Sequence, residues 1–201
     1  MTAASPSAGP SAAPSAAEPE PEPSGPAWPR IDLALEDPDW DALPDPEGLL
    51  ARACAAGFAA AGLSAEGWSV SVLLASDAEI AALNLDHRGK PGPTNVLSWP
   101  AHDLAPEAEG DAPPAPPDPD PMPGEEAEEI GDLALAFGVC AAEARTGGLT
   151  LADHVTHLAL HGTLHCLGYD HISDADAELM EGLESRAMLA MGLRDPYLPV
   201  D

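Results

Sequence analysis

Four short apolar segments from residue 31 onward have the pattern of β-strands. Residues 31–35 alternate apolar and polar side chains, as a half-buried strand does. Residues 68–75, 94–99 and 130–139 are mostly apolar, and the first of these is rich in β-branched side chains. The pattern therefore predicts four strands.

The remaining segments carry apolar residues at helical spacing. The pair Ser76-Asp77 and the Thr150-x-x-Asp153 pattern are N-terminal capping signals, and glycines mark several helix ends. The predicted helices cover residues 46–62, 76–84, 140–146, 150–167 and 174–191. Because strands and helices alternate irregularly, we predict the α+β class, in which helices pack on a small sheet.

Two stretches differ in composition from the rest of the chain. Residues 1–28 are almost entirely Ala, Pro, Ser, Gly and Glu, which leaves too few apolar side chains to offset the entropy of ordering, so we predict a disordered tail. This stretch has no long apolar run of the kind found in a secretory signal or a membrane span. Residues 102–128 are rich in Pro, Asp and Glu and predict a disordered acidic insertion in a surface loop. Residues 29–201 then form a single domain.

The chain has three cysteines, Cys54, Cys140 and Cys166, and no C-x-x-C pair. An odd number without such a pair favours free thiols in a reducing compartment over a disulfide framework. We therefore expect a cytoplasmic protein.

The strongest chemical signal is HGTLHCLGYDH at residues 161–171. His161 and His165 are four residues apart, so on a helix their imidazoles lie on the same face. Gly168 stands where the helix would end, since glycine takes the left-handed conformation at little cost, and the chain can then bring His171 to the same point. Three neutral imidazoles with one open position describe a catalytic zinc site. Imidazole also suits nickel, copper and iron, but one zinc ion is the cofactor we expect.

The same spacing occurs in the zinc-protease motif H-E-x-x-H-x-x-G-x-x-H, so a metallopeptidase is an alternative. In that motif the glutamate is the general base that activates water. This chain has Gly162 at that position, and glycine cannot accept a proton. The ligand spacing of a protease is therefore present without the base, which favours a different reaction.

Neighbouring polar residues are weaker candidates. His157 lies one helical turn before the first predicted ligand, and Asp170 directly precedes the third. Either could orient an imidazole, and either could be purely structural. Glu143 and Asp132 are acidic candidates that the sequence does not place near the histidines.

A metal site can cleave a phosphodiester if a cation stabilises the charge that develops on oxygen. The chain has only seven lysines and arginines, and two of them, Arg88 and Lys90, lie in LNLDHRGKPGPTNVLSWP at residues 83–100. The planar fork of arginine donates paired hydrogen bonds to phosphate. Arg88 is therefore the candidate for the catalytic cation and Lys90 the candidate for substrate binding, although position alone favours a surface arginine in a Gly/Pro turn.

Three blocks of this sequence resemble the YbeY family of bacterial zinc-dependent endoribonucleases, which mature ribosomal RNA. The histidine block resembles the signature of that family, and LNLDHRGKPGPTNVLSWP resembles its second block. The segment EIGDLAL at residues 129–135 resembles its third, and the blocks occur in the order of the family. The resemblance covers roughly residues 30–100 and 129–195.

The resemblance implies a single-strand-specific endoribonuclease that takes part in 16S ribosomal RNA 3′-end processing and ribosome quality control. It implies a mixed sheet of about four strands, with the zinc-site helix at a cleft. In this interpretation His161, His165 and His171 bind zinc, and Arg88 is needed for RNA cleavage. The implied partners are ribosomal RNA and the small ribosomal subunit or its assembly factors, with neither a membrane nor DNA. A non-enzymatic assembly factor with a structural zinc is a further alternative.

The formal net charge of −28 argues against tight, non-specific RNA binding. Nucleic-acid-binding proteins usually present a basic face, because neutralising phosphates dominates their affinity. A local cationic spot formed by Arg88, Lys90 and the metal could still bind one phosphate. We therefore expect an enzyme that is weak on free RNA and acts on RNA presented by a larger particle.

Overall fold

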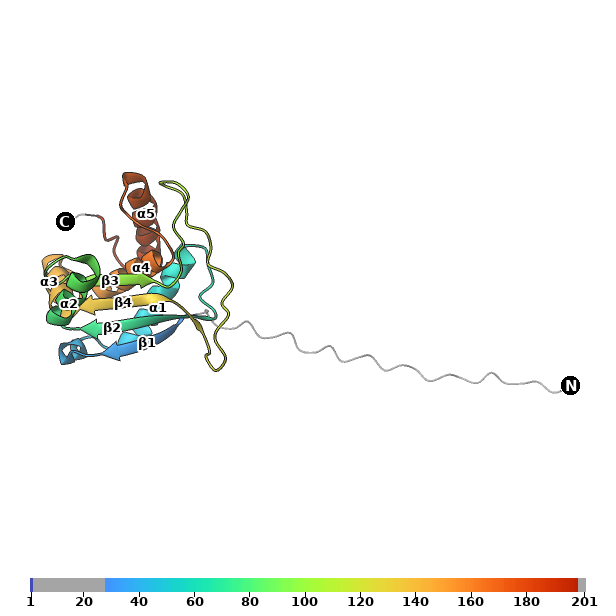
Figure 1. Cartoon of the computed structure of the whole chain (residues 1–201), viewed down its shortest axis with the longest axis horizontal. Coiled ribbons are helices and arrows are strands. Elements are labelled where there is room, and N and C mark those ends of the chain that lie inside the picture. The colour runs from blue at the N-terminus through green and yellow to red at the C-terminus, as the bar shows by residue number, and fades with distance from the viewer. Residues whose placement is uncertain (2–27, 199–201) are drawn as a thin grey trace.

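A four-stranded mixed sheet forms the centre of the molecule in the computed structural model, which describes Met1 and residues 28–198 (Figure 1). The strands are β1 (Arg30–Leu35), β2 (Trp68–Ala75), β3 (Val96–Pro100) and β4 (Glu128–Ala136), in the spatial order β1-β2-β4-β3. The pairs β1–β2 and β2–β4 are parallel, and β3 runs antiparallel to β4. The predicted α+β class and the mixed sheet of four strands are confirmed.

Five α-helices surround this sheet. They are α1 (Pro46–Ala60), α2 (Asp77–Arg88), α3 (Phe137–Thr146), α4 (Leu151–Cys166) and α5 (Asp174–Ala190), and a short 3-10 helix, η1, covers Pro38–Ala42. Helices α1, α4 and α5 lie on one side of the sheet, whereas α2 and α3 lie near the carboxyl ends of β1, β2 and β4 (Figure 1). The predicted helices are therefore all present, and η1 was not predicted.

Several predicted boundaries differ from the observed ones by a few residues, and two of these differences have a clear physical reason. Helix α2 continues past residue 84 to Arg88 and ends because Gly89 takes a left-handed conformation, with φ of 64°. The strand predicted over 130–139 instead ends at Ala136, and α3 begins at Phe137. Helix α3 begins there because Asp77 of α2 accepts a hydrogen bond from the backbone N–H of Val139 at 3.1 Å, so its cap comes from a distant part of the chain.

The main hydrophobic core lies between the sheet and the pair α1 and α4. Val70, Val72 and Leu74 of β2 and Leu133 and Leu135 of β4 point into this layer, as expected for alternate positions of a strand. On the opposite side, α2 packs over one end of the sheet around a smaller apolar cluster. Helix α4 is therefore fixed between the sheet and α5, which makes it a rigid mount for side chains.

The N-terminal 3-10 helix contributes a large core residue that the sequence patterns did not identify. Trp40 of η1 is fully buried, and its indole N–H donates to the carbonyl oxygen of Ala75 at 3.0 Å. This bond satisfies the polar atom of the ring in the core, as buried tryptophans require.

The two low-complexity stretches differ in what the structure describes of them. The tail predicted over 1–28 lies outside the described residues, except for Met1 and Trp28. Residues 101–127 contain no helix or strand and connect β3 to β4, with Leu104 buried and the Gly110 N–H donating to Asp176 at 2.7 Å. The disorder of both stretches stays a prediction. Among the described residues, no helix is long and apolar enough to cross a membrane.

Candidate metal centre

Helix α4 presents two of the predicted ligands on one face. Thr150 caps its start, because the threonine hydroxyl accepts a hydrogen bond from the Asp153 N–H at 3.0 Å. Leu160 and Leu164 are fully buried on another face of the helix, against α5. With its apolar faces packed in this way, the helix leaves His161 and His165 partly exposed and one turn apart.

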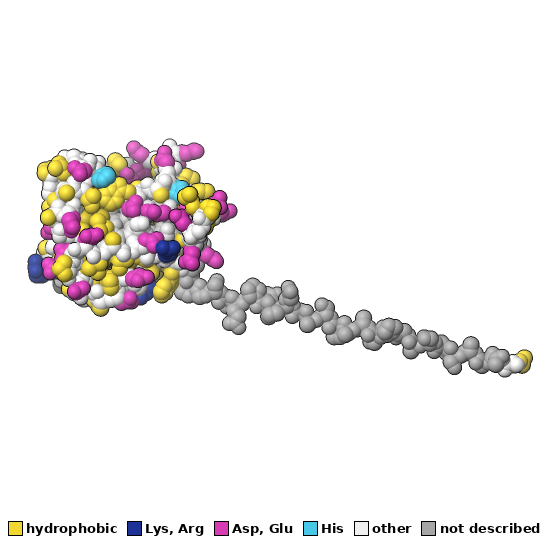
Figure 2. Space-filling model, turned by 60° about the horizontal axis from the view of Figure 1, so that its bottom comes forward, with side chains coloured by type: hydrophobic (Ala, Val, Ile, Leu, Met, Phe, Trp, Pro, Cys, Tyr) yellow, Lys and Arg dark blue, Asp and Glu magenta, His cyan; other side chains and the backbone are white. Residues whose placement is uncertain are grey.

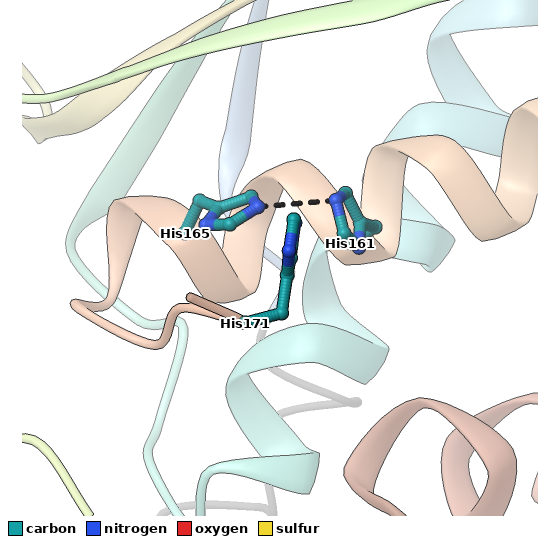
Figure 3. A group of neighbouring side chains, drawn as sticks. All are labelled: His161, His165 and His171. Atoms are coloured by element: carbon teal, nitrogen blue, oxygen red, sulfur yellow. Dashed lines mark hydrogen bonds between the residues drawn. The ribbon is translucent and has the colours of Figure 1, made fainter. Parts of the chain in front are cut away.

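The three predicted ligands converge on one point (Figure 3). One nitrogen of each of His161, His165 and His171 lies within 4.8 Å of the others. The Nε2 atoms of His161 and His165 are 3.1 Å apart, and the His171 ring centroid lies 5.4 Å from that of His161 and 5.0 Å from that of His165. The structure therefore brings together all three residues that the sequence singled out as ligands.

A tight turn returns His171 to the helix. Gly168 has φ of 90°, a conformation that L side chains rarely adopt. A Cβ at this position would lie only 2.4 Å from the backbone oxygen of Leu104. Glycine is thus required at position 168 for two reasons. The backbone conformation disfavours any L side chain, and Leu104 of the 101–127 connection leaves no room for a Cβ.

The outer nitrogens of two imidazoles are bound by acceptors. The Nδ1–H of His165 donates to the backbone carbonyl of Tyr169 at 2.9 Å, and the Nδ1–H of His161 donates to Oε1 of Glu184 at 2.9 Å. Both bonds leave Nε2 free to face the common point. Oriented imidazoles of this kind are the usual arrangement around a protein-bound metal.

The electrostatics favour a neutral, ligating imidazole at His165. Burial is the main cause that lowers its pKa to about 4, with a further contribution from the neighbouring His161, against the carbonyl of Tyr169 and the charge of Asp170, which raise it. A neutral imidazole has a lone pair available for a cation.

The spacing of the ring nitrogens also fits a metal ion. At tetrahedral geometry and bond lengths of about 2.0–2.1 Å, two nitrogens would be about 3.3 Å apart, close to the 3.1 Å between the two Nε2 atoms. The donor set and its spacing therefore fit a single divalent ion such as zinc.

A buried carboxylate behind the triad was not identified from the sequence. Glu184 of α5 is completely buried and accepts hydrogen bonds from His161, from His157 Nε2 at 2.6 Å and from the Tyr197 hydroxyl at 2.7 Å. Burial raises the pKa of this carboxyl, but the hydrogen bonds that the two histidines donate to it outweigh this effect and lower the pKa to about 2. The only sign of this contact in the sequence is a glutamate among the apolar positions of α5. That sign did not identify His161 as its partner.

The histidines open into a small cavity of about 250 Å³. Its lining residues are Arg88, Thr94, Asn95, Val96, Ser98, His161, His165, Asp170 and His171. Arg88 ends α2 and is exposed, and it forms no ion pair with any described residue. Lys90 does not line the cavity, and its backbone N–H donates to the carbonyl of Asn84 at 3.4 Å. The structure thus brings Arg88, but not Lys90, to the walls of the predicted site.

Gly162 is buried on the side of α4 that faces Leu133 of the sheet. A Cβ on this residue would lie 2.5 Å from Cδ2 of Leu133 in β4. The position that carries the base of a zinc protease therefore faces the core here, and a glutamate would need Leu133 to move. This packing argues against the metallopeptidase alternative.

The weaker acidic candidates lie in different places. Asp132 lies on the other side of the sheet, in a shallow apolar hollow that Trp99 and His87 also line. Glu143 accepts hydrogen bonds from His154 at 2.8 Å and from Asn95 at 3.0 Å, so it contacts a residue of the cavity wall. Asp170 lines the cavity and accepts a hydrogen bond from the His171 N–H at 2.7 Å.

The surface around this domain is acidic. Figure 2 shows many Asp and Glu side chains and few Lys and Arg on the face in view. The whole chain has 35 acidic residues against seven Lys and Arg. Such a surface repels free polyanions. Arg88 is therefore a local positive charge beside the histidines on an otherwise acidic surface.

Comparison with known proteins identifies clear relatives. A family model described as "Endoribonuclease YbeY" matches residues 48–192. The Endoribonuclease YbeY of Dinoroseobacter shibae is 52% identical over 175 residues, which cover 87% of this chain and 94% of the relative. The Endoribonuclease YbeY of Ruegeria pomeroyi is 53% identical over 169 residues, which cover 83% of this chain and 97% of the relative. A solution structure of a Thermotoga maritima protein is 21% identical and covers 81% of this chain and 91% of its own, with a TM-score of 0.43.

Proposed function

The chain belongs to the YbeY family of endoribonucleases, and on this premise we propose that it cleaves ribosomal RNA at the cavity lined by Arg88 and the three histidines. An endoribonuclease is a hydrolase of internal phosphodiester bonds. We further propose that one zinc ion is its cofactor and that its reaction serves 16S ribosomal RNA 3′-end maturation and ribosome quality control. The observation that carries the proposal is the presence, on the walls of one cavity, of three convergent imidazoles and one guanidinium that forms no ion pair with any described residue.

The residues of the cavity have distinct tasks in this proposal. His161, His165 and His171 would bind the ion through one ring nitrogen each. When bound, a divalent ion supplies Lewis-acid chemistry to the phosphate and makes a nearby water more acidic. Arg88 would bind the scissile phosphate and stabilise the negative charge that develops on its oxygens. Asp170, whose carboxylate lies on the cavity wall, would orient a water.

The size and charge of the site support a single-stranded substrate that another particle delivers. A cavity of about 250 Å³ accepts one phosphate with part of its nucleotide, and it is far smaller than a segment of duplex RNA. The acidic surface offers little general attraction to RNA. We therefore propose that the small ribosomal subunit or its assembly factors present the RNA, and that Lys90, two residues after Arg88, contacts a flanking phosphate.

The decisive experiment compares three variants on ribosome-bound precursor RNA, with metal content measured on the same preparations. Arg88→Ala should stay folded and keep its metal but lose cleavage by about 100-fold or more, the scale of losing one charge-stabilising group. His165→Ala should lose both metal and cleavage. Arg145→Ala is the matched control, because Arg145 is also an exposed arginine in the last turn of a helix, α3, and does not line the cavity.

Two outcomes would reject this function. Absence of cleavage of ribosome-bound precursor RNA by the unmodified, metal-loaded protein, together with unfolding of His165→Ala, would leave the metal as a structural element of an assembly factor. Cleavage by Arg88→Ala at the rate of the unmodified protein would reject only the catalytic role of Arg88. Robust peptide hydrolysis by the unmodified protein would instead support a metallopeptidase. If RNA is cut, the end groups of the product distinguish attack by the 2′-hydroxyl, which leaves a cyclic phosphate, from attack by water.

A further inference from the structure

A hydrogen-bonded network lies directly behind the histidine triad. Its centre is Glu184, whose exposed fraction is 0%. Oε1 accepts from His161 Nδ1 at 2.9 Å, while Oε2 accepts from His157 Nε2 at 2.6 Å and from the Tyr197 hydroxyl at 2.7 Å. A buried carboxylate is costly unless its oxygens are bonded, and three donors satisfy this one.

The division of donors between the two oxygens has a geometric consequence. Because His157 and Tyr197 bind the same oxygen, Oε2, the other oxygen is left to His161. The bond to Nδ1 fixes both the rotation of the His161 ring and its tautomer, so that the unprotonated Nε2 faces His165 and His171 (Figure 3). This is the task that carboxylates behind metal-bound histidines perform.

The C-terminal segment completes this network. Asp195 accepts from the Ser185 hydroxyl at 2.9 Å and from the backbone N–H of Tyr197 at 3.0 Å. Ser185 directly follows Glu184 on α5, so these two bonds keep the Tyr197 ring beside the carboxylate. The Tyr197 ring also meets that of His157 edge-on, at a centroid distance of 6.0 Å.

We propose that Glu184 is a positioning residue of the metal centre and that Tyr197, from the C-terminal segment, acts through it. The inference rests on the proposed function only in assuming that the triad binds a divalent ion. It assigns to residues 184 and 197 the control of how tightly and in what geometry His161 binds that ion. The residues after the last helix are then part of the site.

The test measures metal affinity rather than cleavage. Zinc affinity is determined by competition with a chromophoric chelator for the unmodified protein and for Glu184→Ala, Glu184→Gln and Glu178→Gln. Glu184→Ala should weaken zinc binding by about 10–100-fold. Glu184→Gln should fall between it and the unmodified protein, because an amide oxygen can still accept from His161 but carries no charge. Glu178→Gln, an exposed position on the same helix, should change nothing.

Tyr197→Phe provides a second variant that leaves the carboxylate in place and the core intact. It should weaken zinc binding by several-fold and alter the visible absorption of the cobalt-substituted protein, which reports ligand geometry. In the double variant Glu184→Ala/Tyr197→Phe the second change should add nothing, because Tyr197 acts only through Glu184. If Glu184→Ala does not fold, Tyr197→Phe alone decides.

The failures of the two proposals are distinguishable. Absence of zinc binding by the unmodified protein rejects the proposed metal site itself. Zinc binding by the unmodified protein that is equally tight in folded Glu184→Ala, or in Tyr197→Phe with an unchanged cobalt spectrum, rejects only the positioning role. In that case Glu184 would serve only as the hydrogen-bond acceptor of two partly buried histidines.

Discussion

Replacing Gly168 by alanine tests how the turn after α4 is built. The backbone of Gly168 has φ of 90°, and a Cβ would approach the carbonyl oxygen of Leu104 to 2.4 Å and its Cβ to 2.7 Å. An L residue in such a conformation costs about 1–3 kcal/mol. Overpacking adds about 1–3 kcal/mol, and here it cannot be relieved by rotating a side chain, because the nearest atom belongs to the backbone.

The expected loss of unfolding free energy is therefore about 2–6 kcal/mol, a large part of the about 5–15 kcal/mol that stabilises a typical domain. Gly148→Ala is the matched control. Gly148 also has a positive φ, of 62°, but a Cβ there meets nothing within 4 Å. The unfolding free energy of Gly148→Ala should fall only by the conformational cost of the alanine, about 1–3 kcal/mol.

The assay is urea denaturation in the presence of a chelator, followed by tryptophan fluorescence, so that metal binding does not contribute to the comparison. A second measurement is zinc affinity, which should fall in Gly168→Ala but not in Gly148→Ala, because the turn also carries His171. Equal losses of stability in the two variants would refute the argument that Leu104 restricts the turn. Leu104→Ala should not rescue Gly168→Ala, since it leaves both the carbonyl oxygen and the Cβ in place.

Three further predictions concern other parts of the molecule. Ser76→Ala removes one half of the capping box of α2, and urea denaturation should show a loss of about 1 kcal/mol. Burial raises the pKa of Cys54 to about 11 and that of Cys140 to about 12, so both thiols are protonated at pH 8. They should react with a disulfide reagent only after unfolding; rapid reaction in the native protein would contradict this. Changing the seven Asp and Glu residues of 107–126 to their amides should raise non-specific RNA affinity at low salt in a filter-binding assay, and an unchanged affinity would show that this segment does not repel RNA.

The sequence predicted the elements better than their ends. The apolar periodicity of α4 and the alternation in β1 involve residues that are close together in the sequence. These patterns can therefore be recognised without a structure. The start of α3 was not, because its cap is Asp77 of another helix, 62 residues away. Trp40 was missed for a similar reason, since the acceptor for its indole N–H is Ala75, 35 residues away in the sequence.

What the sequence determined by itself about the site is the set of histidines. Spacing of four residues, followed by a glycine, brings His161, His165 and His171 near one point through local backbone geometry. The resemblance to a nuclease family could likewise be read from residues that are close together in the chain.

Only the tertiary structure decided what surrounds those histidines. It brings Arg88 to the cavity from the end of α2 and leaves Lys90 outside its walls. It also places Glu184 behind His161 and encloses Gly162 against Leu133. Each of these contacts joins residues more than 20 positions apart, and such pairs meet only when the core between α4, α5 and the sheet has packed. No local pattern encodes a hydrogen bond whose two partners are positioned by different elements.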